Sequence, residues 1–171
     1  MAYCAVVDAC ALYPFSLRDT LIRLAAAELY DLFWSERILD EVSRNLVKRE
    51  VATEEQAERL LQKMRDVFPE AMVADEQITA LEGAMTNASK DRHVLAAAVS
   101  AGAEAIVTFN LRDFPPEACE LHDVEAMHPD DFLMILFGVS SETVVAVLET
   151  QASDLRKPCL LYTSPSPRDR G

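Results

Sequence analysis

Apolar residues follow two patterns along the chain, short continuous runs and longer stretches with helical spacing. Residues 3–7 (YCAVV) and 105–108 (AIVT) are short, partly β-branched runs, which are typical of strands buried on both faces of a parallel sheet. Between them, apolar positions recur every three or four residues, which predicts several helices. Strands and helices in this order, with short connections, favour an α/β fold whose parallel sheet is covered by helices.

Capping residues and breakers predict where the helices begin and end. Residues 21–32 are rich in Ala and Leu, which predicts a helix there. Ser35 is placed to cap the next helix, and Thr53 with Gln56 forms a capping box for the one after it. The remaining expected elements are a short strand at 71–73, a helix at 78–85 and a helix at 94–100 that ends at Gly102.

The chain divides by pattern into three parts. A length of 171 residues fits one compact domain, which we expect to be an α/β domain over residues 1–128. Pro129, and Ser140 or Ser141, then begin two further helices, which predicts a helical C-terminal extension over residues 129–158. From residue 159 the periodicity stops and two prolines occur within three residues. Residues 159–171 therefore resemble a non-native tail, and the extension is then truncated.

Composition limits the class of protein. The chain has 29 acidic side chains against 16 Lys and Arg, a net charge of −13, which argues against holding nucleic acid by charge alone. No apolar run approaches the roughly 20 residues that span a bilayer, and no signal peptide is evident, so we expect a cytoplasmic protein. The four cysteines are scattered and do not suggest a disulfide framework. Cys119, His122 and His128 lack a fourth ligand at the spacing of a zinc site.

Four acidic residues occupy unusual positions. Asp8 directly follows the first apolar strand, Asp113 follows the second, Asp91 begins the helix at 94–100, and Glu41 lies in the helix after Ser35. A charge at the end of a buried strand needs a partner. If the four carboxylates converge, they repel one another unless cations lie between them, and oxygen ligands suit Mg²⁺ or Mn²⁺. Such ions activate water and neutralise the charge that develops on a phosphate during hydrolysis.

Three of these acids also have simple structural explanations. Glu41 could pair with Arg37 on the same helix. Asp113 could be a turn residue before Pro115, and Asp91 is a favourable residue at a helix N-terminus. Spacing alone leaves both interpretations open.

Four segments in this order and spacing resemble the PIN-domain family of metal-dependent ribonucleases, and in particular the VapC-like toxins of bacterial toxin–antitoxin pairs. The segments are VVDA followed by LYP (6–14), ILDEV (38–42), KDRHVLAAA (90–98) and IVTFNLRDFP (106–115). The later HPDDFL (128–133) resembles a subgroup with a helical C-terminal extension. Together these similarities cover nearly all of residues 3–155.

The resemblance implies a three-layer PIN-like fold with a central parallel sheet flanked by helices. It implies a metal-binding and catalytic quartet for Mg²⁺ or Mn²⁺, namely Asp8, Glu41, Asp91 and Asp113, and two orienting residues, Thr108 and Asn110. Three basic residues are expected to contact phosphate, with a merely solvated role as the alternative: Lys90, Arg92 and Arg112. The implied reaction is hydrolysis of an RNA phosphodiester by metal-activated water, with single-stranded or looped RNA as substrate. A cognate antitoxin and a homodimer are the implied protein partners.

Two positions depart from the family pattern. Cys10 stands two residues after the first aspartate, where Asn or Ser is common, and we expect weaker support for Asp8. Ala88 and Ser89 replace a common Asp-Pro, which leaves the loop before Asp91 less acidic. Since no acid of the quartet is lost, we expect an active enzyme.

A different function remains open, that of a PIN-like module which binds an antitoxin or another subunit with little catalysis. Such a module needs exposed apolar surface. The candidates are Leu17, Leu21, Leu24, Leu29, Phe33 and Trp34, most of which we expect in the core. A third interpretation, an aspartyl-phosphate receiver domain, lacks its acid pair near the first strand and its late lysine.

Overall fold

A four-stranded parallel sheet organises the molecule. The computed structural model describes residues 3–163, with side chains up to residue 155. The strands are β1 (Tyr3–Val7), β2 (Tyr30–Phe33), β3 (Ala105–Val107) and β4 (Glu125–Met127), and their order in the sheet is β2-β1-β3-β4. All three neighbouring pairs are parallel, which confirms the predicted sheet type.

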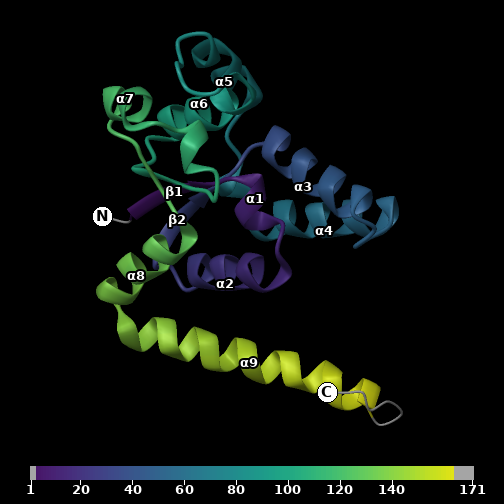
Figure 1. Cartoon of the computed structure of the whole chain (residues 1–171). Coiled ribbons are helices and arrows are strands. Elements are labelled where there is room, and N and C mark those ends of the chain that lie inside the picture. The colour runs from purple at the N-terminus through teal and green to yellow at the C-terminus, as the bar shows by residue number, and fades with distance from the viewer. Residues whose placement is uncertain (1–2, 164–171) are drawn as a thin grey trace.

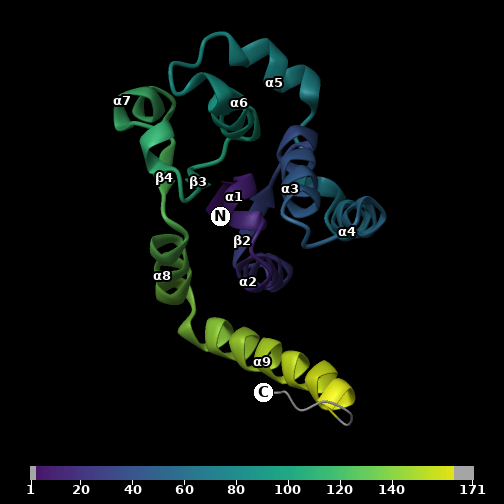
Figure 2. The same ribbon diagram turned by 45° about the vertical axis from the view of Figure 1, so that its right-hand side comes forward.

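Helices cover the sheet on both sides. They are α1 (Ala9–Leu12), α2 (Phe15–Ala26), α3 (Glu36–Lys48), α4 (Glu54–Val67), α5 (Asp75–Glu82), α6 (Arg92–Ala101), α7 (Pro116–Cys119), α8 (Pro129–Val139) and α9 (Ser141–Thr163). In Figures 1 and 2, α5 and α6 lie on one side of the strands, and α2 lies on the other with α9 beyond it. This arrangement gives the three α/β layers that the sequence predicted.

The predicted caps are present. Ser35 Oγ accepts a hydrogen bond from the Ile38 N–H at 3.2 Å, at the start of α3. The Thr53 and Gln56 side chains form the reciprocal capping box of α4. Gly102 ends α6 with a φ of +68°, a conformation that glycine adopts without strain.

The helix predicted over residues 21–32 is wrong in its second half. The chain leaves α2 after Ala26, turns at Glu28 with a φ of +64°, and enters β2. Tyr30 and Leu32 are buried while Asp31 between them is exposed, the alternation of a strand. Pairing with β1 overrides the helical propensity of this Ala/Leu-rich segment.

The structure also differs from prediction at two shorter strands. β4 was not predicted, because its three residues include the exposed Glu125 and give no recognisable apolar run. The strand expected at 71–73 reduces to one parallel bridge between Trp34 and Met72.

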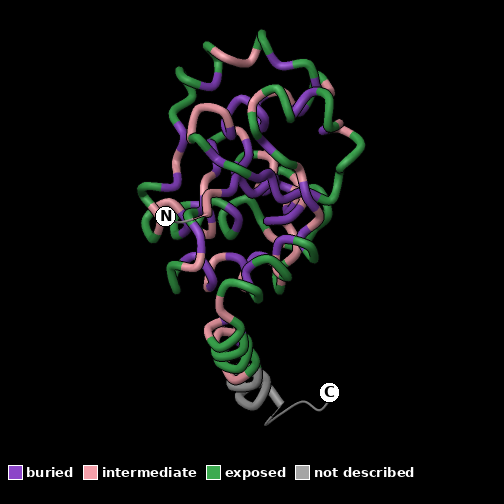
Figure 3. The backbone as a smooth tube through the Cα atoms, turned by 90° about the vertical axis from the view of Figure 1, so that its left-hand side faces the viewer, coloured by how far each residue is buried: buried purple, intermediate pink, exposed green. Residues whose placement is uncertain are grey.

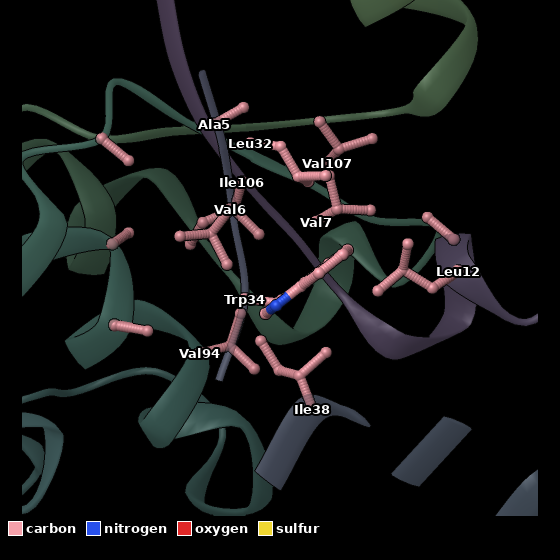
Figure 4. Packing of buried hydrophobic residues seen from close by; sticks show 14 of the residues in the cluster. Ala5, Val6, Val7, Leu12, Leu32, Trp34, Ile38, Val94, Ile106 and Val107 are labelled. Atoms are coloured by element: carbon pink, nitrogen blue, oxygen red, sulfur yellow. The ribbon is translucent and has the colours of Figure 1, made fainter. Parts of the chain in front are cut away.

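The core forms where the sheet meets α6 and the helices on its other face. Side chains of β1, β3 and α6 interdigitate with Trp34 and Ile38, as Figure 4 shows, and all of these are buried. Of the apolar residues considered for an interface, Leu21, Leu24 and Trp34 are fully buried, and the rest pack against the core half-buried, namely Leu17, Leu29 and Phe33. This set is therefore mainly core, as expected.

The C-terminal helices are attached at defined points. Phe132 of α8 is fully buried, with its ring edge-on to Tyr30 at 4.9 Å between centroids. α9 is held to α2 by the hydrogen bond of Thr20 to Gln151 and by the Arg23–Asp154 ion pair. The backbone of α9 continues to Thr163, and residues 164–171 of the proposed tail lie outside the described residues.

Candidate functional site

Asp8 is fixed at the point where β1 ends and α1 begins. Its backbone N–H donates to the Val107 carbonyl at 3.0 Å, which joins the ends of β1 and β3. Its side chain caps α1, with Oδ1 accepting the Ala9 N–H at 2.8 Å. Oδ2 accepts from the Thr108 hydroxyl at 2.9 Å. Burial raises the pKa of this carboxyl, the hydrogen bonds from Thr108 and Ala9 oppose that shift, and Glu41 adds to it.

Thr108 connects Asp8 to the loop after β3. Its hydroxyl oxygen also accepts the Asn110 backbone N–H at 3.0 Å, and its own N–H donates to the Met127 carbonyl of β4. Thr108 therefore orients Asp8 from a fully buried position. Asn110 contributes only its backbone N–H to this network, and the residue is exposed to solvent.

Asp91 is a buried carboxylate with an unsatisfied oxygen. It ends a short 3₁₀ turn, Ser89–Asp91, directly before α6, and only 6% of it is exposed. Among the described residues, Oδ2 has no hydrogen-bond partner. Burial, followed by the nearby carboxylates of Asp8 and Asp113, raises the pKa of Asp91 to about 7. The charged form of Asp91 is thus less favourable in the protein than it is in water.

Asp113 lies on the solvent side of this group and carries a basic partner. It ends a 3₁₀ turn, Leu111–Asp113, and its Oδ2 lies 3.5 Å from Lys90 Nζ. The carboxylate of Asp113 is the main cause of a raised pKa of Lys90, to which Asp91 and Glu41 also contribute. Lys90 therefore lies in the negative field of three of the four acids.

Glu41 does not form the ion pair considered as its structural explanation. The Arg37 guanidinium instead binds Glu82, at 2.9 and 3.0 Å, and Asp75, at 3.2 Å. Glu41 is half-buried on α3 and acts electrostatically on Asp8, so α3 turns it towards the other carboxylates. The pairing with Arg37 therefore does not explain Glu41, whose carboxylate lies within electrostatic reach of Asp8.

Cys10 lies within the hydrogen-bond network around Asp8. Its sulfur is 3.7 Å from Asp8 Oδ2 and 3.4 Å from Thr108 Oγ1, and it accepts the Phe109 N–H at 3.3 Å. We expected weaker support for Asp8 because Cys10 replaces the common Asn or Ser, and these contacts do not match that expectation. A thiol here still links the end of β1 to the loop after β3.

The basic residues differ in their availability. Lys90 and Arg112 are exposed beside the acids. Arg92 is half-buried, and its Nε donates to the carbonyl of Asn87 at 3.0 Å. Asn87, which the sequence did not single out, is buried and donates to the Asp91 carbonyl at 3.0 Å. It shapes the loop that presents Asp91, and an isolated Asn in a loop carries no signal of such a role.

A cleft of about 380 Å³ opens beside these residues and is lined by Phe109, Asn110, Leu111, Arg112 and Asp113. Phe109 is 44% exposed at this cleft, and its ring meets His128 edge-on at 5.1 Å. An exposed aromatic ring therefore lines the same cleft as Asp113.

The oxygen ligands of the four acids suit a hard divalent cation, although their carboxylates do not lie close enough together to coordinate one. Within residues 3–155, no three His, Cys, Asp or Glu side chains are close enough together to hold a metal ion. The four acids offer only oxygen, and the unpartnered Oδ2 of buried Asp91 is the atom that a cation would satisfy. Two of the three residues weighed for zinc have other contacts, with Cys119 near the Phe114 carbonyl and His128 capping α8.

Comparison with known proteins identifies the family. Residues 4–112, more than half of the chain, match the PIN domain. The chain belongs to the PIN domain family. A stretch of 68 residues is 50% identical to "Putative ribonuclease VapC50" of Mycobacterium tuberculosis (strain ATCC 25618 / H37Rv), and it covers 40% of this chain and 40% of that relative. No solved structure matches the chain.

The PIN match agrees with the architecture and with the resemblance seen in the sequence. Its span includes Asp8, Glu41 and Asp91 and ends one residue before Asp113. It also includes β2, β3 and all of β1 except Tyr3, so the strand ends beside the candidate site lie inside the PIN domain.

The raised pKa of Asp91 predicts a pH-dependent penalty on stability. Because the folded-state pKa exceeds the ordinary value, the stability that Asp91 contributes is complete at low pH and is lost as pH rises through about 7. In EDTA at pH 8, the free energy of unfolding of Asp91→Asn should therefore exceed that of the unmodified protein by about 2 kcal/mol. Its melting temperature should be higher by roughly 4–8 °C. The difference should shrink as the pH falls below about 7 and should vanish near 3.8, the ordinary pKa of an aspartate. A variant that melts lower at pH 8 in EDTA would contradict this account.

Proposed function

We propose that this PIN domain protein is a Mg²⁺- or Mn²⁺-dependent ribonuclease that hydrolyses RNA phosphodiester bonds and acts in the cytoplasm as the toxin of a toxin–antitoxin pair. The observation that carries the proposal is the buried, unpartnered carboxylate oxygen of Asp91 beside Asp8 and Asp113, at the carboxyl ends of β1 and β3. In an open parallel sheet, this edge is where ligands bind. The partial identity to a relative named as a ribonuclease supports the same activity.

The quartet divides into fixed and adjustable ligands. Asp8 is held by Thr108, the Ala9 N–H and Cys10, so one carboxylate has a set position. Asp91, Glu41 and Asp113 would complete the site with oxygen donors. The bound cation would supply water activation and charge neutralisation at the phosphate.

The remaining groups suit an RNA strand rather than a duplex. Lys90 and Arg112 are exposed next to the acids and would contact phosphates, and Lys90 would exchange its contact with Asp113 for one with RNA. Phe109 offers an exposed ring at the cleft, on which an unpaired base could stack. With a net charge of −13, these local contacts and the cation must replace a general attraction for RNA.

A cognate antitoxin and a homodimer belong to the same proposal. Their support is the resemblance of the four sequence segments to VapC-like toxins, together with the partial match to VapC50. An antitoxin segment with cationic side chains would suit the acidic site.

Cleavage of a mixed pool of structured RNAs tests the activity. Asp8→Ala and Asp91→Asn should each lower Mg²⁺- or Mn²⁺-dependent cleavage by about 100-fold or more, which corresponds to about 2.7 kcal/mol, and EDTA should abolish it. Asp40→Asn, which changes the exposed carboxylate next to Glu41, is the matched control and should retain activity. Cleavage that persists in both variants would refute the site. Absence of both cleavage and Mn²⁺ binding would instead favour the interaction module.

Stacking on Phe109 predicts an effect on substrate binding. Phe109→Ala should raise KM for a single-stranded oligoribonucleotide by about 10-fold, with kcat changed much less, because stacking on one base is worth about 1–3 kcal/mol. Leu121→Ala, at a residue that is 73% exposed outside the cleft, serves as the control and should leave both constants unchanged. An unaltered KM in Phe109→Ala would show that RNA does not use this ring.

A further inference from the structure

Phe109 is an exposed aromatic residue on a fixed backbone. Its N–H donates to Cys10 Sγ at 3.3 Å, and the next N–H, that of Asn110, donates to the Thr108 hydroxyl at 3.0 Å. The residue is nonetheless 44% exposed, at the cleft that Asp113 also lines. A side chain on a fixed backbone can still rotate about its own bonds, so the direction of the Phe109 ring needs a separate explanation.

A second ring lies against Phe109. The imidazole of His128 is 5.1 Å from the Phe109 ring between centroids, with the two planes at 86°. This is the edge-to-face arrangement that aromatic rings favour. No other aromatic ring and no guanidinium contacts Phe109 within the part of the chain that the structure describes. His128 therefore restricts the directions that the Phe109 ring can take.

His128 is held on the side of the sheet and on the side of the helix. The Thr108 N–H donates to the Met127 carbonyl at 3.0 Å, which joins the end of β4 to the loop that carries Phe109. The His128 side chain caps α8, with Nδ1 accepting the Asp130 N–H at 3.0 Å. The imidazole is thus fixed by its own hydrogen bond and leaves a ring edge or face for Phe109.

The helix that His128 caps is anchored in the core. Phe132, one helical turn after His128, is fully buried and lies against the rings of Tyr3 and Tyr30, at 6.0 and 4.9 Å between centroids. Figure 2 shows the chain passing from β4 directly into α8. In Figure 3, buried residues gather in the body of the molecule, and α9 leads away from it with mainly exposed residues along its described part. The start of α8 is thus a point where the C-terminal helices meet the loop after β3.

We propose that His128 is a positioning residue for RNA binding, which holds the Phe109 ring at the cleft in an orientation that receives an unpaired base. This role rests on the proposed function, in which RNA stacks on Phe109. A ring that is already held loses less rotational freedom when a base stacks on it, so binding is tighter. His128 lies outside residues 4–112, which match the PIN domain, and it gives α8 a part in substrate binding.

Two substitutions separate this role from the capping of α8. Asn is a favourable residue before the first turn of a helix, so His128→Asn should keep the cap and lose the ring. His128→Phe should keep the ring and lose the acceptor for the Asp130 N–H, which should lower the melting temperature by roughly 2–4 °C. His128→Asn should melt with the unmodified chain.

Binding of a fluorescein-labelled single-stranded oligoribonucleotide to the full chain, followed by anisotropy with Ca²⁺ as the divalent cation, tests the proposal. His128→Asn should raise Kd by about 5-fold, less than Phe109→Ala, because the Phe109 ring is still present. His128→Phe should bind the RNA like the unmodified chain. His122→Asn changes a histidine that does not line the cleft, and this matched control should leave Kd unaltered.

The position of the ring can also be measured without RNA. In NMR spectra of the free protein, His128→Asn should shift the ring signals of Phe109, and His122→Asn should not. When His128→Asn is added to Phe109→Ala, RNA binding should weaken no further, because His128 acts through this ring.

Three results would overturn the role of His128. The first is an unchanged Kd in His128→Asn while Phe109→Ala weakens binding. The second is a loss in His128→Phe equal to that in His128→Asn. The third is a further loss when His128→Asn is added to Phe109→Ala, which would show that His128 contacts RNA itself. An unchanged Kd in Phe109→Ala would refute the stacking and this proposal with it, without bearing on the cleavage that Asp8→Ala tests.

Discussion

Negative charge buried at the carboxyl ends of β1 and β3 is the constraint on which the site depends. The backbone there is tied by the Asp8 N–H to the Val107 carbonyl, and Asp8 is satisfied by Thr108 and Ala9. Asp91 has no comparable set of donors, and it lies near Asp8 and Asp113. A fold that keeps this arrangement gives up stability at neutral pH, and under the proposed function a bound cation would restore it.

The surrounding structure is arranged to keep these acids in place. Cys10 and Thr108 join the end of β1 to the loop after β3, and Asn87 fixes the turn before α6. Arg37 forms ion pairs with Glu82 and Asp75 on α5, so its guanidinium does not pair with the four carboxylates of the candidate site. Among the described residues, Lys90 alone has an ion pair with a member of the quartet, and because it is exposed it is accessible to a phosphate under the proposed function.

Local signals predicted much of the fold. The apolar runs gave β1 and β3, and the caps at Ser35 and Thr53 gave the starts of α3 and α4. β2 was missed because Ala and Leu favour a helix locally, while pairing with β1 is a long-range interaction that no local pattern displays.

The sequence was sufficient to propose the residues of the candidate site, but not their contacts. The positions of Asp8 and Asp91 beside an apolar strand and an apolar helix face singled them out, and the PIN resemblance joined them to Glu41 and Asp113. The partners of Arg37 and the contacts of Cys10 depend on side chains far apart in sequence, such as Glu82 and Phe109, so spacing could not predict them.

Binding of Mn²⁺, followed by electron paramagnetic resonance in the unmodified chain, Asp8→Ala and Asp40→Asn, tests the central claim most directly. If the buried carboxylates form a cation site, the unmodified chain and Asp40→Asn should bind Mn²⁺ with the same affinity, and Asp8→Ala should bind it at least about 10-fold more weakly. Equal affinity in all three proteins would show that the charge buried at the ends of β1 and β3 does not serve a metal.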